Sequence, residues 1–140
     1  MLKKQTGIWI DGSKAIIVSL ADGIEKVKEI DADIENRNYH YATDNQGKFS
    51  EGHHHINHEK KMEERKKHQI DDFIDEVMTY IKQDDELLVL GPGELKISLK
   101  KRIEKDGELF SKLMSVESAD KMTDNQLVAK VRSFFRGCVH

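Results

Sequence analysis

An unbroken apolar run, Leu87 to Leu90 in the stretch "ELLVLGPGELKISLKKRIEK", constrains the fold of this chain more than any other feature. A strand with one face in water alternates apolar and polar side chains, so a continuous apolar run indicates a strand covered on both faces. Gly91-Pro92-Gly93 ends the run, and the apolar spacing of residues 95–103 then predicts a short helix. The stretch is therefore typical of a strand-turn-helix unit inside a layered α/β domain.

The first part of the chain predicts a meander of three strands. Apolar residues alternate along "TGIWIDGSKAIIVSLADG", and Asp11-Gly12 and Asp22-Gly23 are dipeptides of the tight turns that join antiparallel strands. In the third segment Ile24, Val27 and Ile30 do not alternate perfectly, which predicts a bulge in that strand.

Helical spacing dominates much of the rest of the sequence. The apolar residues from Ile70 to Ile81 form one amphipathic stripe. The charged residues "EKKMEERKKHQ" before them favour helix through pairs three and four apart. We expect this helix to begin near Asn57 or Glu59, with its first half as a solvated extension. A last helix is predicted in "MTDNQLVAKVRSFF", where Thr123 and Gln126 match a capping box.

The order of these elements predicts an α/β layered domain, in which a mixed sheet opened by a three-strand meander carries helices packed on it. "KLMSVES" is the remaining strand candidate. At 140 residues, without a repeat or linker, residues 1–140 are expected to form a single domain.

Composition limits the partners and the compartment. The net charge is -3, so a contact with nucleic acid requires a local basic surface. Cys138 is the single cysteine, which excludes an internal disulfide and fits a reducing compartment. No stretch has the apolar length of a signal peptide or of a membrane span, so we expect a cytoplasmic protein without a membrane partner.

Residues 35–59 predict a mobile, exposed, His-rich loop, because they carry few aliphatic residues and no helix or strand period. The candidate metal ligands in it are His53, His54, His55 and His58. Histidine is a ligand type for zinc, nickel and copper. However, HExxH is missing and no second pair completes a four-ligand set. We therefore expect no cofactor, and at most adventitious or weak zinc or nickel binding at this loop.

Gly91, Pro92 and Gly93 admit two interpretations, a structural turn and an anion site. The free N–H groups and the dipole of the helix that follows favour negative charge. The motif GxxxxGK[ST] is absent, however, and Lys96 comes too early for a P-loop. A turn that closes a βα crossover is the simpler interpretation.

Two basic stretches are candidates for nucleic-acid binding. The first opens the long helix, and the second is the "KISLKKRIEK" helix, which also holds Arg102 and Lys105. The candidate residues are Lys60, Lys61, Arg65, Lys66, Lys67, Lys96, Lys100 and Lys101. Together they could grip a phosphate backbone. The opposing interpretation is a solvated helix surface balanced by nearby glutamates.

Asp11 raises the possibility of an enzyme. At the end of the first strand it could hold a metal of a phosphodiesterase or nuclease, joined by Glu94, Glu117, Asp120 or the loop histidines. Because Asp11 precedes Gly12, its carboxylate also has a ready role in the turn. The turn is the favoured interpretation.

The stretch "VLGPGELKISLKKRIEK" resembles the middle domain of archaeal and eukaryotic class 1 peptide-release factors and of their stalled-ribosome relative, Pelota. In that family a hydrophobic strand runs into a small-Pro-Gly turn and a helix with an early lysine, here Lys96. The element order agrees over nearly the whole chain. The ending "SVESADKMTDNQLVAKVRSFF" is similar to that of short bacterial stand-alone relatives of this domain. The resemblance implies a ribonuclease H-like fold, without implying nuclease activity.

The chain departs from the release factors at their catalytic tripeptide. They carry Gly-Gly-Gln in the loop before the long helix, where this chain has Asn45-Gln46-Gly47. Gln46 therefore cannot take the family's catalytic role, and peptide release is not expected. What the resemblance still implies is contact with the ribosome or tRNA, as in the Pelota branch, whose middle domain also lacks the tripeptide.

These observations favour a translation-associated binding protein without covalent chemistry over an enzyme. The enzyme alternative is a metal-dependent phosphodiesterase or nuclease that uses Asp11 and the loop histidines. A third hypothesis is an interaction protein whose histidines sense pH or metal.

Overall fold

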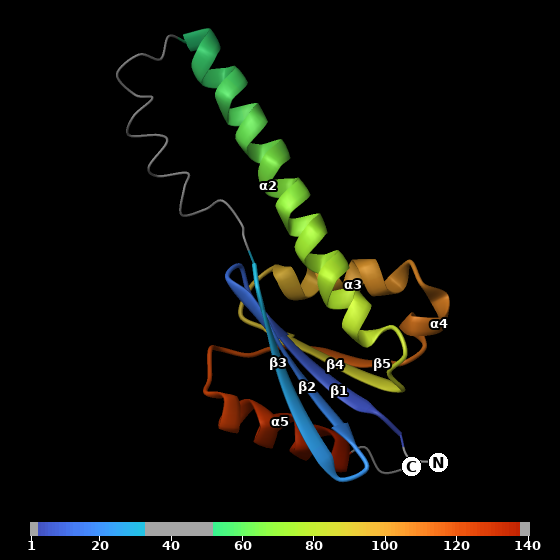
Figure 1. Ribbon diagram of the computed structural model, residues 1–140. Coiled ribbons are helices and arrows are strands. Elements are labelled where there is room, and N and C mark those ends of the chain that lie inside the picture. The colour runs from blue at the N-terminus through green and yellow to red at the C-terminus, as the bar shows by residue number, and fades with distance from the viewer. Residues whose placement is uncertain (1–2, 33–51, 138–140) are drawn as a thin grey trace.

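A computed structural model describes the backbone of residues 3–32 and 52–137, and the side chains of residues 3–32 and 60–137. Its centre is a five-stranded sheet in the order β3-β2-β1-β4-β5 (Figure 1). The strands are β1 (Gln5–Ile10), β2 (Lys14–Ala21), β3 (Ile24–Asp31), β4 (Glu86–Gly91) and β5 (Leu113–Ser118). The helices are α2 (Gly52–Ile81), α3 (Leu95–Glu104), α4 (Gly107–Phe110) and α5 (Asp124–Gly137).

The sheet is mixed. β1 pairs with β2 and β2 with β3 in antiparallel fashion, whereas β1 with β4 and β4 with β5 are parallel pairs. This arrangement confirms the predicted α/β layered domain with its opening three-strand meander. The short helix α4, which ends the connection from α3 to β5, was not anticipated by the sequence patterns.

The bulge predicted in the third strand is wrong. β2 and β3 pair without a shift from Lys14 opposite Asp31 to Ala21 opposite Ile24. Ile24 and Val27 are both exposed, so the imperfect alternation reflects an edge strand with little helix cover. The register shift in this sheet instead lies between Leu87 and Leu88, where β4 pairs with β5.

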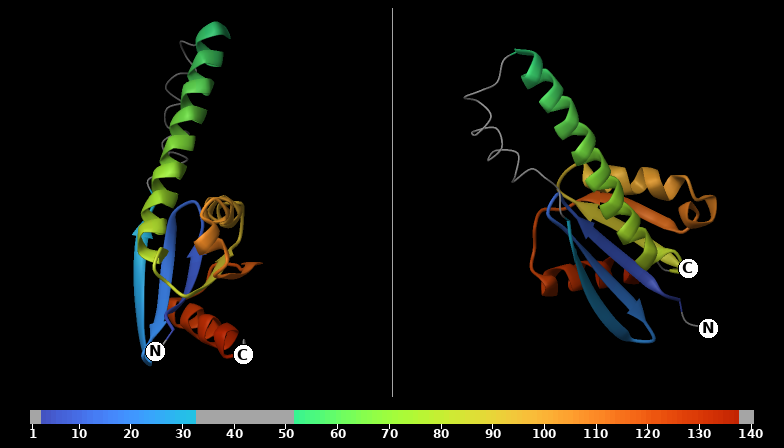
Figure 2. Two further views of the ribbon diagram at one scale, coloured as in Figure 1. Left: turned by 90° about the vertical axis from the view of Figure 1, so that its right-hand side faces the viewer. Right: turned by 45° about the horizontal axis from the view of Figure 1, so that its top comes forward.

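Helices cover both faces of the sheet, as the apolar run of β4 requires (Figures 1 and 2). Leu87 and Val89 join a core cluster with buried residues of α2, α3 and α4. Leu88 and Leu90 join a second cluster with Trp9 of β1 and the buried face of α5. Alternate residues of one strand thus fill two different cores, which explains why none of them is polar.

Helix α2 begins at Gly52, earlier than the predicted start near Asn57 or Glu59. Residues 52–59 are therefore helical and do not belong to the predicted loop 35–59. Adding residues to an existing helix is easier than nucleating one, so the strong helix formers after Glu59 carry the helix back through the histidines. The rest of the predicted loop, residues 35–51, lies outside the described residues.

Helix α5 begins with the predicted capping box. The N–H of Thr123 donates to Gln126 Oε1 at 2.9 Å, and the N–H of Gln126 donates to Thr123 Oγ1 at 3.2 Å. The helix lies very close to β1, because a Cβ added at Gly7 would meet Val131 Cγ2 at 2.4 Å. The predicted helix start is confirmed, and Gly7 allows the close packing of α5.

A buried polar contact fixes the end of α2. Asp84, in the turn between α2 and β4, is 1% exposed. Its Oδ2 accepts a hydrogen bond from Thr6 Oγ1 at 2.6 Å, and its Oδ1 lies 3.1 Å from Lys4 Nζ. These contacts bind the start of β1 to the turn.

None of the described helices combines the length and apolarity needed to cross a membrane.

Candidate nucleic-acid interface

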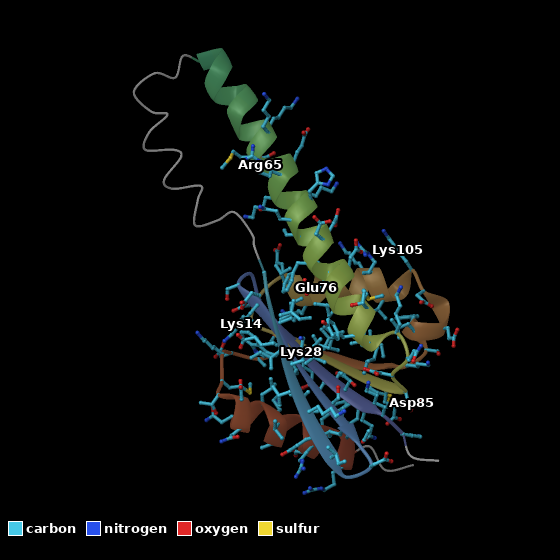
Figure 3. All side chains as sticks on the ribbon, in the orientation of Figure 1. Lys14, Lys28, Arg65, Glu76, Asp85 and Lys105 are labelled. Carbon is cyan, nitrogen blue, oxygen red and sulfur yellow. The ribbon has the colours of Figure 1, made fainter. Side chains whose placement is uncertain are left out.

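The outer part of α2 extends beyond the sheet, and Figures 1 and 2 show it standing clear of the other described elements. Lys60, Lys61, Lys66 and Lys67 on this part are all exposed. Arg65, labelled in Figure 3, lies on the same projecting segment. The first predicted basic stretch is thus on the surface, in the position expected for a solvated extension.

A groove of about 420 Å³ runs between α2 and α3, and we call it the helix-pair groove. Helix α2 lines it with Glu63, Lys66, Lys67, Ile70, Asp71 and Ile74. Helix α3 and the residue after it line it with Ser98, Lys101, Arg102 and Lys105. The structure therefore brings residues of the two predicted basic stretches together at one site, with five cationic and two acidic side chains around two isoleucines.

Arg102 holds the two walls of this groove together. Its guanidinium forms an ion pair and hydrogen bond with Asp75 of α2, and it lies 3.9 Å from an oxygen of Asp71. The arginine charge is therefore already balanced by carboxylates of the neighbouring helix. Its role in the groove is to position α3 against α2.

The four lysines of the groove are in a different situation. Lys66 and Lys67 line one wall, and Lys101 and Lys105 line the other. In the part of the chain with described side chains, no carboxylate lies within ion-pair distance of these four amines. Figure 3 shows Lys105 on the α3 side, beside α2. Four ammonium groups are thus available to an anionic partner.

Lys96 and Lys100 do not line the groove. They are four residues apart and lie on the flank of α3 away from Lys101 and Lys105. The ammonium of Lys96 also donates to the carbonyl of Gly93 at 2.6 Å. These two predicted residues are therefore separated from the other basic residues of α3.

Lys60, Lys61 and Arg65 are divided by the periodicity of α2. Lys60 is seven residues from Lys67 and shares its face, whereas Lys61 and Arg65 are four apart and lie on the opposite face. None of the three lines the helix-pair groove. Of the eight predicted basic residues, the groove thus brings together Lys66, Lys67 and Lys101.

The Gly-Pro-Gly turn has a packing role at its first residue. A Cβ at Gly91 would lie 2.4 Å from the carbonyl oxygen of Ile10, so β1 and β4 approach too closely there for any side chain. The Gly91 carbonyl accepts from the N–H of Ala119 at 3.0 Å, which ties the end of β4 to the residue after β5. Pro92 and Gly93 are exposed.

Asp11 is used by the turn that follows β1. Its Oδ1 accepts from the N–H and the hydroxyl of Ser13, at 2.8 and 2.9 Å, and from the N–H of Lys14 at 2.9 Å. Within the described side chains, no group of three His, Cys, Asp or Glu could hold a metal ion. The side chains of His53, His54, His55 and His58 lie outside the described set, so the metal prediction made for them is not tested.

Sequence patterns pointed to basic stretches but did not identify the groove. The sequence signal for it is a second helical face: Ser98, Lys101, Arg102 and Lys105 have the spacing i, i+3, i+4, i+7. Ile70 and Ile74, which also line the groove, belong to the amphipathic stripe that the sequence predicts for this helix. That the two helices lie side by side is a tertiary fact with no local signal.

Comparison with known proteins gives a fold relationship. No protein-family model matches the sequence, and no curated protein matches it. Among solved structures, that of the archaeal translation termination factor aRF1 is similar, with a TM-score of 0.52 and 13% sequence identity over 96% of this chain. The chain spans 39% of the length of that factor. At this identity the likeness shows the fold alone, an α/β layered domain.

Proposed function

We propose that this protein is a translation-associated binding protein that contacts ribosomal or transfer RNA. The observation that carries the proposal is the meeting of two basic helical stretches in the helix-pair groove, beside a helix that extends away from the sheet. The fold supports it, because the similar structure is that of a translation termination factor. Contact with ribosomes implies residence in the cytoplasm.

The proposed contact involves no covalent chemistry. We do not propose peptide release, because the sequence holds Asn45-Gln46-Gly47 and no Gly-Gly-Gln. The resemblance to the Pelota branch, which also lacks the tripeptide in its middle domain, supports binding without hydrolysis. With a net charge of -3, the local cationic groove is the surface that could attract RNA.

Sucrose-gradient fractionation of cell extracts, at low and moderate salt, tests the proposal. We expect the protein in ribosomal fractions at low salt, and partial release at moderate salt, because phosphate contacts weaken as salt rises. As a control, alanine replaces Lys26 and Lys121, which are exposed and lie away from the groove. This variant should sediment as the wild type does. Absence from ribosomal fractions in both conditions, together with no RNA binding, would refute the proposal.

The enzyme alternative predicts a different result. A metal-dependent phosphodiesterase or nuclease using Asp11 should retain stoichiometric metal in tag-free protein and lose activity on Asp11→Ala. We expect neither, because three donors in its own turn already occupy Oδ1 of Asp11. Metal analysis by mass spectrometry and a nuclease assay on the wild type and the variant separate the two functions.

A further inference from the structure

We propose that the helix-pair groove binds one strand of an RNA phosphate backbone without reading its bases. This inference rests on the proposed function and deepens it, by assigning the contact to one site and one mode of recognition. It depends on the lysines of the two walls, the aliphatic floor between them and the nature of the other lining side chains.

Both walls carry a pair of lysines, and the α2 wall also carries the carboxylates Glu63 and Asp71. Lys66 and Lys67 from α2 and Lys101 and Lys105 from α3 give each wall a pair of ammonium groups without a carboxylate partner among the described residues. An ammonium is a point charge with three N–H donors, which can donate to a phosphate oxygen from many directions. A chain of phosphates lying along the groove can therefore be held from both sides.

The floor favours an extended polyanion over a compact charged ligand. Ile70 and Ile74 are the apolar lining residues; Ile70 is partly exposed and Ile74 is buried, and neither offers a hydrogen bond to a bound molecule. Lysine stems pack along apolar surface of this kind while their charged ends remain in water. The groove volume of about 420 Å³ has room for one strand of backbone.

The groove lacks the side chains that read bases. Sequence-specific contacts mainly use aromatic stacking, amides or a bidentate arginine, and less often carboxylates or hydroxyls. Among its described lining residues none is aromatic and none is an amide. The one arginine, Arg102, is held by Asp75 and Asp71, and the Ser98 hydroxyl faces the carbonyl oxygen of Glu94 at 3.4 Å. The carboxylates Glu63 and Asp71 also line the groove, and Asp71 lies beside Arg102, so the four lysine charges dominate recognition.

Fluorescence anisotropy with short labelled oligo(U) and oligo(A) tests the proposal on the full chain. We expect similar affinities for the two sequences, and competition by inorganic polyphosphate, because only phosphates are contacted. Four phosphate contacts on a single strand predict a salt slope of about -2.8, or roughly 50-fold weaker binding between 50 and 200 mM salt. A strong preference for one sequence would overturn base-independent binding.

Three double variants locate the site. Lys66→Ala with Lys67→Ala, and Lys101→Ala with Lys105→Ala, should each lower affinity roughly a hundredfold at 50 mM salt and reduce the slope by about 1.4. The matched control, Lys96→Ala with Lys100→Ala, removes two lysines from the other flank of α3 and should leave binding within about threefold. Unchanged melting temperatures establish that each variant is folded. An equal or larger loss in the control pair would place the contact elsewhere and overturn the inference.

Gradient fractionation of the same variants separates this inference from the function on which it rests. If the wild type binds RNA through the groove yet stays out of ribosomal fractions, the groove assignment stands and the ribosomal function fails. A fourth variant combines Lys66→Ala, Lys67→Ala, Lys101→Ala and Lys105→Ala. If it still enters ribosomal fractions and still binds RNA, the function stands and the groove assignment is wrong. Binding to anionic phospholipid vesicles without binding to RNA would overturn the inference in favour of a membrane surface.

Discussion

The two halves of α2 differ although they form one continuous helix. The inner half packs against the sheet, and its apolar side chains are buried in the core: Phe73, Ile74, Val77, Met78 and Ile81. In the outer half, every side chain from Lys60 to His68 is exposed except Met62. The inner half stabilises the fold, whereas the outer half is supported by helix propensity and by charge pairs three and four apart.

This difference separates stability from contact along one element. Substitutions in the inner half should be felt by the whole domain, because the helix there completes the core. Substitutions in the outer half should be felt mainly by a partner. The helix-pair groove begins where one half gives way to the other, with Lys66 and Lys67 just before Ile70.

A pair of proline variants provides the strongest test of the contrast. Glu76 and Glu64 are both exposed glutamates inside α2, one in each half. We expect Glu76→Pro to lower the free energy of unfolding by about 3 kcal/mol or more, because it breaks the packed part of the helix. Glu64→Pro should lower it by less than about 1 kcal/mol, because only the projecting part frays.

Urea unfolding followed by circular dichroism measures both proline variants. Glu64→Pro should still reduce the helical signal of the folded protein, which shows that the projecting helix was disturbed. Equal losses of stability in the two variants would mean that the outer half contributes to the fold, and the contrast would be wrong.

The elements that the sequence predicts are those fixed by local signals, and the features that it does not predict depend on contacts between elements. Helix α5 and the opening meander were predictable because capping residues, turn dipeptides and alternation are local signals. The start of α2 at Gly52 was missed because histidine and glycine give no strong local preference, and helix propagation decided the boundary. The groove was missed because it depends on α3 lying beside α2, which no pattern within either helix specifies.

The turn before α3 repeats the contrast between a packed and a free position within three residues. A Cβ at Gly91 would meet the Ile10 carbonyl oxygen at 2.4 Å, whereas a Cβ at Gly93 would meet no atom within 4 Å. We expect Gly91→Ala to lower the free energy of unfolding by about 1–3 kcal/mol through overpacking. Gly93→Ala should change it by no more than about 1 kcal/mol, in the stabilising direction, since its backbone is not left-handed.

Thermal and chemical unfolding of the two alanine variants give this comparison directly. The expected order is Gly93→Ala at or above the wild type and Gly91→Ala below it. A Gly91→Ala protein as stable as the wild type would show that β1 and β4 can separate at this point, and that the glycine is not required by packing.

The smallest effect is expected at the ion pair between α3 and the inner half of α2. The side chains of Arg102 and Asp75 are 28% and 60% exposed, so water screens their attraction. A double-mutant cycle with Arg102→Ala and Asp75→Ala should give a coupling energy of about 0.2–1 kcal/mol, which decreases further in 1 M salt. Apolar contacts would then hold the inner half in place, with the ion pair setting only the approach of α3. A coupling energy well above 1 kcal/mol that persists in high salt would instead show that this ion pair stabilises the packing of α2. The inner half would then depend on charge pairs, as the outer half does.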